Sequence, residues 1–140
     1  MLTGTTDAKS VRVGAIEIAN SRPFVLIAGP CQIESEAHAL EVAAALVEIT
    51  RAAGISLIYK SSFDKANRTS ASAARGIGID AGLQILARVR ETYGVPVLTD
   101  VHLPEQCAPT AEAVMPRAEV AVARSAAASD PPSRGWVSCW

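Results

Sequence analysis

The sequence contains few aromatic residues and few cysteines, and both shortages restrict the kind of protein that it encodes. Aromatic residues make up 4% of the 140 residues, so a core must be built from valine, isoleucine, leucine and alanine. The three cysteines, Cys31, Cys107 and Cys139, share no Cys-x-x-Cys or similar spacing. An odd number of unclustered cysteines favours a reducing compartment. We therefore expect a cytoplasmic protein.

Long apolar segments and a strong charge of one sign are also missing. The apolar run FVLIAG is far too short to span a bilayer, and the polar start, MLTGTTDAKS, lacks the apolar region of a secretory signal. The formal net charge is −1, whereas nucleic-acid binding needs a broad basic surface. The sequence therefore predicts neither a membrane nor a nucleic-acid partner. Its 49% hydrophobic and 19% charged residues are typical of a folded domain.

Apolar patterns predict the strands. Residues 11–20, VRVGAIEIAN, alternate apolar and polar residues around Gly14 and predict a small β-hairpin. Residues 23–29 form a continuous apolar run, which is typical of a parallel strand buried on both faces. A second buried strand is expected at 55–59 and a third at 95–101.

Capping residues and helical spacing predict the helices between these strands. Ser35 is the expected N-cap of the first helix, which ends at Gly54. Leu40, Ala43, Ala44, Val47 and Arg51 follow helical spacing along it. A second helix begins near Asp80 and ends at Gly94, and its apolar face consists of Leu83, Leu86, Val89 and Tyr93. Pro104 is expected in the first turn of a third helix.

The order of these elements predicts an α/β fold with a parallel sheet, because each strand is followed by a crossover to the next. Polar residues follow every strand: Cys31, Gln32 and Glu34; then Lys60 to Arg75; then Asp100 and His102. Ligands bind at the carboxyl ends of the strands in such folds. Three strands cannot close a barrel, which usually needs about eight strands.

The segment after the second strand gathers positive charge. Two of the chain's three lysines, Lys60 and Lys65, lie there, followed by Arg68 and Arg75. Lysine offers a compact charge and arginine a two-pronged donor, and both suit phosphate or carboxylate groups. The alternative is an ordinary solvated loop. From the residues alone, we interpret the segment as a binding site for a phosphorylated metabolite.

Three motifs at the strand ends closely resemble those of the 3-deoxy-D-manno-octulosonate 8-phosphate synthase family: IAGPCQIES, KSSFDKANRTS and TDVH. The resemblance runs from about Val11 to Val114, and SFDKANR is the most specific part. GPC also occurs in the related 3-deoxy-arabino-heptulosonate 7-phosphate (DAHP) synthases. Those relatives typically have K-P-R-T-S where this chain has K-A-N-R-T-S, so they rank second.

The resemblance implies the N-terminal portion of a TIM (β/α)8 barrel with an N-terminal β-hairpin, in an enzyme that is usually a homotetramer. The implied reaction condenses phosphoenolpyruvate with D-arabinose 5-phosphate, releases phosphate and makes a precursor of a lipopolysaccharide sugar. It implies catalytic roles for Lys60, Lys65 and Asp100. Lys60 and Lys65 match lysines that hold phosphoenolpyruvate, and Asp100 matches a carboxylate near the sugar hydroxyls. The other implied substrate-binding residues are Ser62, Asn67, Arg68 and Thr69.

Cys31 occupies the position at which metal-dependent members of the family bind a divalent metal through a thiolate. The resemblance therefore implies a divalent metal ion, with Cys31 as one ligand. One thiolate does not make a metal site, and the family's histidine, glutamate and aspartate ligands lie on later strands that this sequence does not contain. His38 and His102 are not expected to replace them, because His38 lies in the first helix and His102 follows the wrong strand.

The resemblance divides the chain into three parts. Residues 1–10 are expected to be a disordered tail, and residues 11–114 the hairpin with the first three βα units of the barrel. Residues 115–140 have no sustained periodicity, so we interpret them as a divergent tail, either a flexible segment or the product of out-of-frame translation. We therefore expect the 140-residue chain to be inactive alone. A DAHP synthase-type enzyme that uses erythrose 4-phosphate and a non-catalytic phosphate-binding fragment are the alternatives.

Overall fold

The computed structural model describes residues 10–64, 77–114 and 122–124. Within these residues the elements follow in this order: β1 (Val11–Val13), β2 (Ile16–Ile18), β3 (Val25–Ala28), α1 (Glu36–Ala53), β4 (Ser56–Lys60), α2 (Ile79–Tyr93), β5 (Val97–Val101), the short 3-10 helix η1 (Pro104–Gln106), α3 (Cys107–Val114) and β6 (Val122–Arg124). The predicted tail at 1–10 lies outside the described residues except for Ser10, and so does most of the predicted tail at 115–140. None of the described helices is long and apolar enough to cross a membrane.

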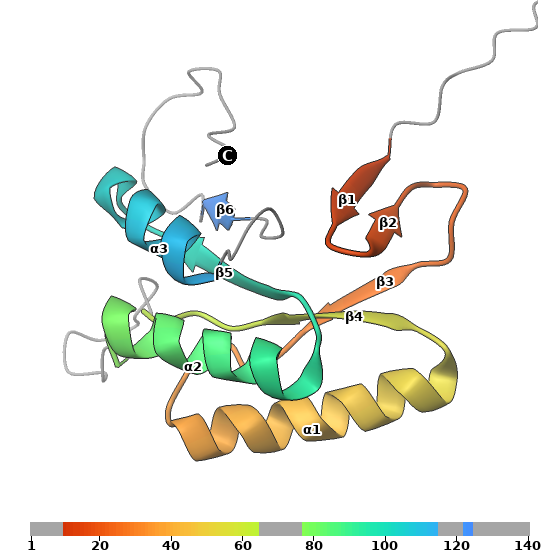
Figure 1. Cartoon of the computed structure of the whole chain (residues 1–140), viewed down its shortest axis with the longest axis horizontal. Coiled ribbons are helices and arrows are strands. Elements are labelled where there is room, and N and C mark those ends of the chain that lie inside the picture. The colour runs from red at the N-terminus through yellow and green to blue at the C-terminus, as the bar shows by residue number, and fades with distance from the viewer. Residues whose placement is uncertain (1–9, 65–76, 115–121, 125–140) are drawn as a thin grey trace, which may run out of the picture.

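The main sheet is parallel and has the order β3-β4-β5-β6 (Figure 1). This confirms the predicted α/β class and the three predicted strands. The fourth strand, β6, was not predicted, because its three residues lie in a segment that has no sustained apolar pattern. A separate antiparallel pair is formed by β1 and β2, with Val11 opposite Ile18.

Local sequence signals set the limits of the two long helices. The Ser35 side chain accepts a hydrogen bond from the backbone N–H of His38 (3.2 Å) and caps the start of α1. Gly54 and Gly94 end α1 and α2 in the left-handed conformation, with φ of 67° and 66°, which glycine adopts without a steric penalty. The predicted limits of both helices are thus confirmed to within a residue.

Only some of the residues that follow helical spacing in α1 are buried. The buried residues of this helix are Ala39, Ala43, Val47 and Thr50, whereas Ala44 and Arg51, which belong to the spaced set, are exposed. The spaced set and the buried residues both fit the 3.6-residue helical period. Only the packing partner therefore decides which of the two stripes faces inward. For α2 the predicted residues Leu83, Leu86 and Val89 are buried.

The two faces of the sheet are covered differently. On one face, α1 and α2 pack against the sheet (Figure 1) and form a core with Tyr59 and Val97. On the other face, Ile58 and Leu98 pack against the β1–β2 pair through Val13. Side chains alternate between the two faces along a strand, so Lys60 lies on the same face as Ile58, two residues closer to the carboxyl end.

The prediction that the first strand is buried on both faces is wrong. Ile27 in β3 is 51% exposed and the preceding Phe24 is 66% exposed. The physical reason is position, because β3 is the edge strand of the described sheet, and the cluster beneath the β1–β2 pair includes Val25 of β3 but neither Ile27 nor Phe24. A continuous apolar run reports the hydrophobicity of a strand but not its place in the sheet.

The fully buried Tyr59 gives the fold a dependence on alkaline pH. Burial raises the pKa of Tyr59 from 10.0 to about 12, and its hydroxyl donates a hydrogen bond to the Ala39 carbonyl (3.3 Å). The folded state therefore holds this proton more tightly than the unfolded state does. The resulting stabilisation is complete below pH 10 and is lost as the pH rises towards 12.

We expect the free energy of unfolding to fall by about 3 kcal/mol over this range because of Tyr59, since each pKa unit corresponds to about 1.4 kcal/mol. Urea unfolding of the chain between pH 10 and pH 12 measures it. The Tyr59→Phe variant should lose this part of the pH dependence. Tyr93→Phe is the matched control, because it removes a second tyrosine hydroxyl that donates to a carbonyl of α1 (Tyr93 to the Leu40 carbonyl, 3.0 Å). Identical pH profiles for Tyr59→Phe and the unmodified chain would contradict the prediction.

Candidate functional site

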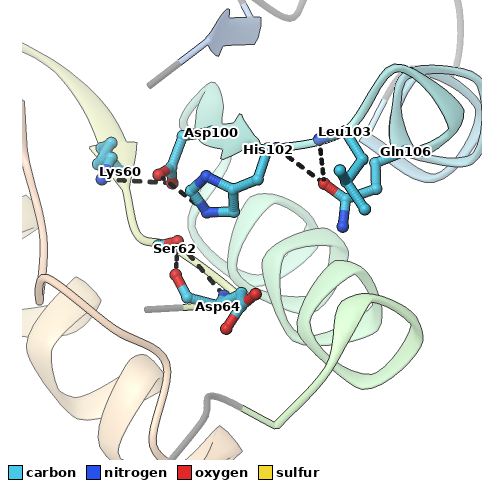
Figure 2. Close-up of polar contacts among 7 residues, drawn as sticks. All are labelled: Lys60, Ser62, Asp64, Asp100, His102, Leu103 and Gln106. Atoms are coloured by element: carbon cyan, nitrogen blue, oxygen red, sulfur yellow. Dashed lines mark hydrogen bonds and ion pairs between the residues drawn. The ribbon is translucent and has the colours of Figure 1, made fainter. Parts of the chain in front are cut away.

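Lys60 and Asp100 meet where β4 and β5 end. Lys60 is in register with Leu98 on β5, and Asp100 lies two residues further along the same face. Their side chains approach until Lys60 Nζ is 3.6 Å from Asp100 Oδ1 (Figure 2). The sequence analysis predicted that both residues follow strands whose carboxyl ends lie together, and the structure brings them into contact. The two side chains are 34% and 18% exposed, so the pair is partly open to solvent.

His102 joins this pair from the other side of Asp100. Its Nε2 lies 3.5 Å from Asp100 Oδ2, so the carboxylate stands between an ammonium group and an imidazole (Figure 2). Asp100 Oδ1 and His102 Nε2 are both buried and make no hydrogen bond to any described residue. Buried polar atoms normally have hydrogen-bond partners, so these two atoms offer unused capacity to a ligand. We call Lys60, Asp100 and His102 the strand-end array.

Phe63 packs against the imidazole of His102. The two rings meet edge to face, with centroids 6.3 Å apart and an angle of 65° between the ring planes. Phe63 is buried, and α2 passes so close that a Cβ on Gly82 would lie 2.4 Å from Phe63 Cβ. Glycine at position 82 therefore leaves room for the Phe63 ring to pack against His102.

Ser62 lies next to the array, but its hydroxyl is engaged locally. Ser62 Oγ donates to the Asp64 carbonyl and accepts from the Asp64 N–H (3.3 Å). Its neighbour Ser61 is fully buried, and its hydroxyl donates to the Pro30 carbonyl (2.7 Å). Both serines thus hold the chain that leaves β4. The single proton of Ser62 Oγ is engaged, but a hydroxyl oxygen has two lone pairs, so one acceptor position remains for a sugar hydroxyl.

The segment after β3 runs alongside the segment after β4. The Ser62 N–H donates to the Cys31 carbonyl (3.3 Å), and the Ile33 N–H donates to the Ser62 carbonyl (2.9 Å). The two segments also approach closely at Gly29, where a Cβ would lie 1.9 Å from the Lys60 carbonyl oxygen. The backbone of Gly29 therefore packs directly against the residue that carries the ammonium group.

The predicted metal ligand Cys31 lies at the expected strand end, and the residue is exposed. Within the described ranges, no three histidine, cysteine, aspartate or glutamate side chains are grouped closely enough to hold a metal ion. The described residues do not form a metal site by themselves. The role of Cys31 as a metal ligand stays a prediction.

Four of the predicted site residues lie outside the described residues. They are Lys65, Asn67, Arg68 and Thr69, in the range 65–76. Of the predicted site residues that the structure describes, Lys60 and Asp100 contact each other, Ser62 lies two residues after Lys60, and Cys31 is joined to Ser62 through the backbone. These placements leave the predicted roles of the residues as proposals.

Sequence reasoning did not identify the roles of three residues that shape the array. His102 is a partner of Asp100, and Phe63 packs against the His102 ring. The Gln106 side chain bonds to the backbone at His102 (2.8 Å). One signal was available for His102, because residues two apart along an extended chain point to the same side. Asp100 and His102 in TDVH have that spacing. No local signal connects Phe63 to His102.

Comparisons with known proteins identify the family. The sequence profile of the DAHP synthetase I family matches residues 5–118. A 2-dehydro-3-deoxyphosphooctonate aldolase from Rhodopseudomonas palustris (strain BisB5) is 63% identical over 107 residues, which are 76% of this chain and 37% of the relative. The enzyme of the same name from Methylobacterium radiotolerans is 60% identical over 109 residues, 78% of this chain and 38% of the relative.

A third relative with that name, from Bradyrhizobium diazoefficiens, is 55% identical over 114 residues, which cover 81% of this chain and 40% of the relative. The chain thus spans well under half the length of the curated relatives that it matches. The predicted resemblance to 3-deoxy-D-manno-octulosonate 8-phosphate synthases is confirmed by these names. Since the family profile covers most of the sequence, including the array, the chain belongs to the DAHP synthetase I family.

Proposed function

We propose that this chain carries part of the site of an enzyme that condenses phosphoenolpyruvate with D-arabinose 5-phosphate and water to give 3-deoxy-D-manno-octulosonate 8-phosphate and phosphate. The names of the relatives support this activity. The single observation that carries it is the contact of 3.6 Å between Lys60 Nζ and Asp100 Oδ1 at the carboxyl ends of β4 and β5.

The proposed chemistry suits the strand-end array. Phosphoenolpyruvate carries a phosphate and a carboxylate, and the Lys60 ammonium offsets part of that charge. As C3 of phosphoenolpyruvate bonds to C1 of the pentose phosphate, positive character develops at C2, which preplaced charges and dipoles stabilise. Asp100 accepts hydrogen bonds from sugar hydroxyls. Asp100 Oδ1 and His102 Nε2 make no hydrogen bond to a described residue, so each can form one with a polar group of either substrate.

We further propose that the parallel sheet and its three described helices are the N-terminal portion of a TIM barrel in a cytoplasmic homotetramer. The exposure of two large apolar side chains, Ile27 in β3 and Phe24 just before it, supports a larger fold, because further elements would cover them. For the segment that follows β4, we propose that Lys65, Asn67, Arg68 and Thr69 contact the two substrates. Any metal bound through Cys31 would need further ligands from outside the described residues.

A second enzyme function is favoured by the family description, which names DAHP synthetase. An enzyme of that type would accept erythrose 4-phosphate in place of arabinose 5-phosphate. The sequence K-A-N-R-T-S at 65–70 supports the first assignment, because those relatives typically have K-P-R-T-S. The remaining alternative is a non-catalytic phosphate-binding fragment, which is favoured by the share of the relatives that the chain spans, 37% to 40%.

A chimera separates these functions. Residues 11–114 of this chain replace the matching segment of the Rhodopseudomonas palustris relative, to which the chain is 63% identical. We expect the chimera to release phosphate from phosphoenolpyruvate when arabinose 5-phosphate is present, and at least about 100-fold more slowly with erythrose 4-phosphate, the discrimination that a polar pocket provides. A preference for erythrose 4-phosphate would overturn the assignment.

The 140-residue chain serves as the control in the same assay. We expect no phosphate release from it, because it spans 37% of that relative. Calorimetry with phosphoenolpyruvate then distinguishes a binding fragment, which gives saturable heat, from a chain that does not bind. Turnover by the 140-residue chain would contradict the expectation.

A further inference from the structure

Gln106 lies beyond the strand-end array, yet its side chain bonds to the backbone that carries His102. Its Oε1 accepts hydrogen bonds from the N–H of His102 (2.8 Å) and from the N–H of Leu103 (3.1 Å), as Figure 2 shows. The Gln106 N–H donates in turn to the Leu103 carbonyl (3.1 Å). One glutamine thus closes the turn that leaves β5.

This turn contains backbone groups that none of the described strands satisfies. The pairing of β5 with β6 ends at Val101, and an unpaired backbone N–H that loses water costs free energy. Both groups that face the Gln106 side chain are donors, so only the amide oxygen can accept from them. This requirement fixes the orientation of the amide, because the NH2 group can make neither bond.

The backbone at His102 determines where its imidazole lies. The ring is held on one side by the edge-to-face contact with Phe63, and its Nε2 lies 3.5 Å from Asp100 Oδ2. Its side chain is 15% exposed, so it has little room to find another position. A shift of the backbone at residue 102 would therefore move the imidazole away from Asp100.

We propose that Gln106 is a positioning residue for the strand-end array, which holds His102 against Asp100 without itself touching a ligand. Its effect on substrate rests on the proposed function, whereas its effect on His102 does not. Lys60 contacts the other oxygen of the Asp100 carboxylate. By holding His102 against Asp100, the hydrogen bonds of Gln106 therefore also limit the positions that the Lys60 ammonium can take.

Nuclear magnetic resonance of the 140-residue chain tests the contact. The chain has two histidines, so the imidazole signals of His102 can be read against those of His38 as an internal control. In Gln106→Met, the side chain keeps its size but loses its acceptor. We expect this variant to lose the cross-peak between the His102 and Phe63 rings and to exchange the His102 amide hydrogen about tenfold faster, as for one lost hydrogen bond.

Two variants control for simple damage to the fold. Gln106→Glu keeps the accepting oxygens and should restore both signals. Gln84→Met makes the same substitution at an exposed position of α2 and should change neither. Gln106→Ala is the second truncation if the methionine variant fails to fold. Unchanged His102 signals in the folded truncation would overturn the proposal.

Titration with phosphoenolpyruvate connects the positioning to the site. In the unmodified chain we expect the ligand to shift the His102 ring signals, and in Gln106→Met to need about tenfold more ligand for half the shift, which corresponds to 1.4 kcal/mol. Gln106→Glu should respond as the unmodified chain does. Equal titrations in all variants would overturn the effect on substrate. If phosphoenolpyruvate shifts no His102 signal in the unmodified chain, the effect on substrate is overturned for this chain and the chimera alone decides the proposed function, while loss of the ring contact in Gln106→Met still supports the positioning.

Discussion

The Lys60→Met substitution is expected to lower the rate of phosphate release by the chimera about 100- to 1,000-fold, the usual effect of removing one preplaced electrostatic group. Methionine fills much of the lysine volume but carries no charge. The Asp100 carboxylate, 3.6 Å from the lost ammonium, would then face the anionic substrate without a neighbouring cation. Repulsion adds to the missing attraction, so both substrate binding and turnover should suffer. Steady-state phosphate release measures this effect.

Two variants show whether the charge or its placement matters. Lys60→Arg keeps the positive charge but replaces a compact ammonium with a planar guanidinium, so we expect only partial activity. Arg88→Met removes a cation from the surface of α2, where the side chain is 62% exposed and lies 3.6 Å from Glu36, and should leave the rate unchanged. A Lys60→Met chimera with nearly full activity would remove Lys60 from the proposed site.

The Gly29→Ala substitution is expected to have the largest effect on stability. The added Cβ would lie 1.9 Å from the Lys60 carbonyl oxygen and 2.9 Å from its carbonyl carbon. Both are backbone atoms, so no side-chain rotation relieves the overlap, and β3 must separate from β4 beyond Ala28. We expect the free energy of unfolding to fall by about 3 kcal/mol, the upper part of the range for overpacking.

Chemical unfolding of the 140-residue chain measures this loss, and Gly54→Ala provides the comparison. Gly54 has φ of 67° and no atom within 4 Å of an added Cβ, so alanine there costs only the left-handed conformation, about 1 kcal/mol. The excess loss in Gly29→Ala is then the steric part. Similar losses for the two variants would show that the two segments separate easily, and that Lys60 is not held by this contact.

The sequence was sufficient to predict those features that depend on neighbouring residues along the chain. Ser35 and Gly54 set the ends of α1 through bonds within a few residues, and the apolar runs located β3, β4 and β5. The meeting of Lys60 with Asp100 was also predictable, because the carboxyl ends of neighbouring parallel strands lie at one edge of a sheet.

The features that depend on distant partners were not predictable. The exposure of Ile27 depends on what lies across the sheet from β3, and the exposure of Ala44 depends on which stripe of α1 meets α2. The support of His102 requires Phe63 and Gly82, which are far away in sequence and meet only after folding. The strand β6 pairs with β5, from which α3 separates it along the chain. Its own three residues give no periodic signal.

The arrangement of β3, α1 and β4 has a consequence for synthesis on the ribosome. This contiguous stretch, Val25 to Lys60, contains both strands of one pairing, so it can begin to fold as soon as it emerges. Asp100 follows 40 residues after Lys60 (100 − 60), which at about 5–20 residues per second means a delay of roughly 2–8 seconds. During that interval β4 is the growing edge of a nascent sheet. The charged ammonium of Lys60 at the end of β4 opposes pairing of this edge strand with a strand of another nascent chain.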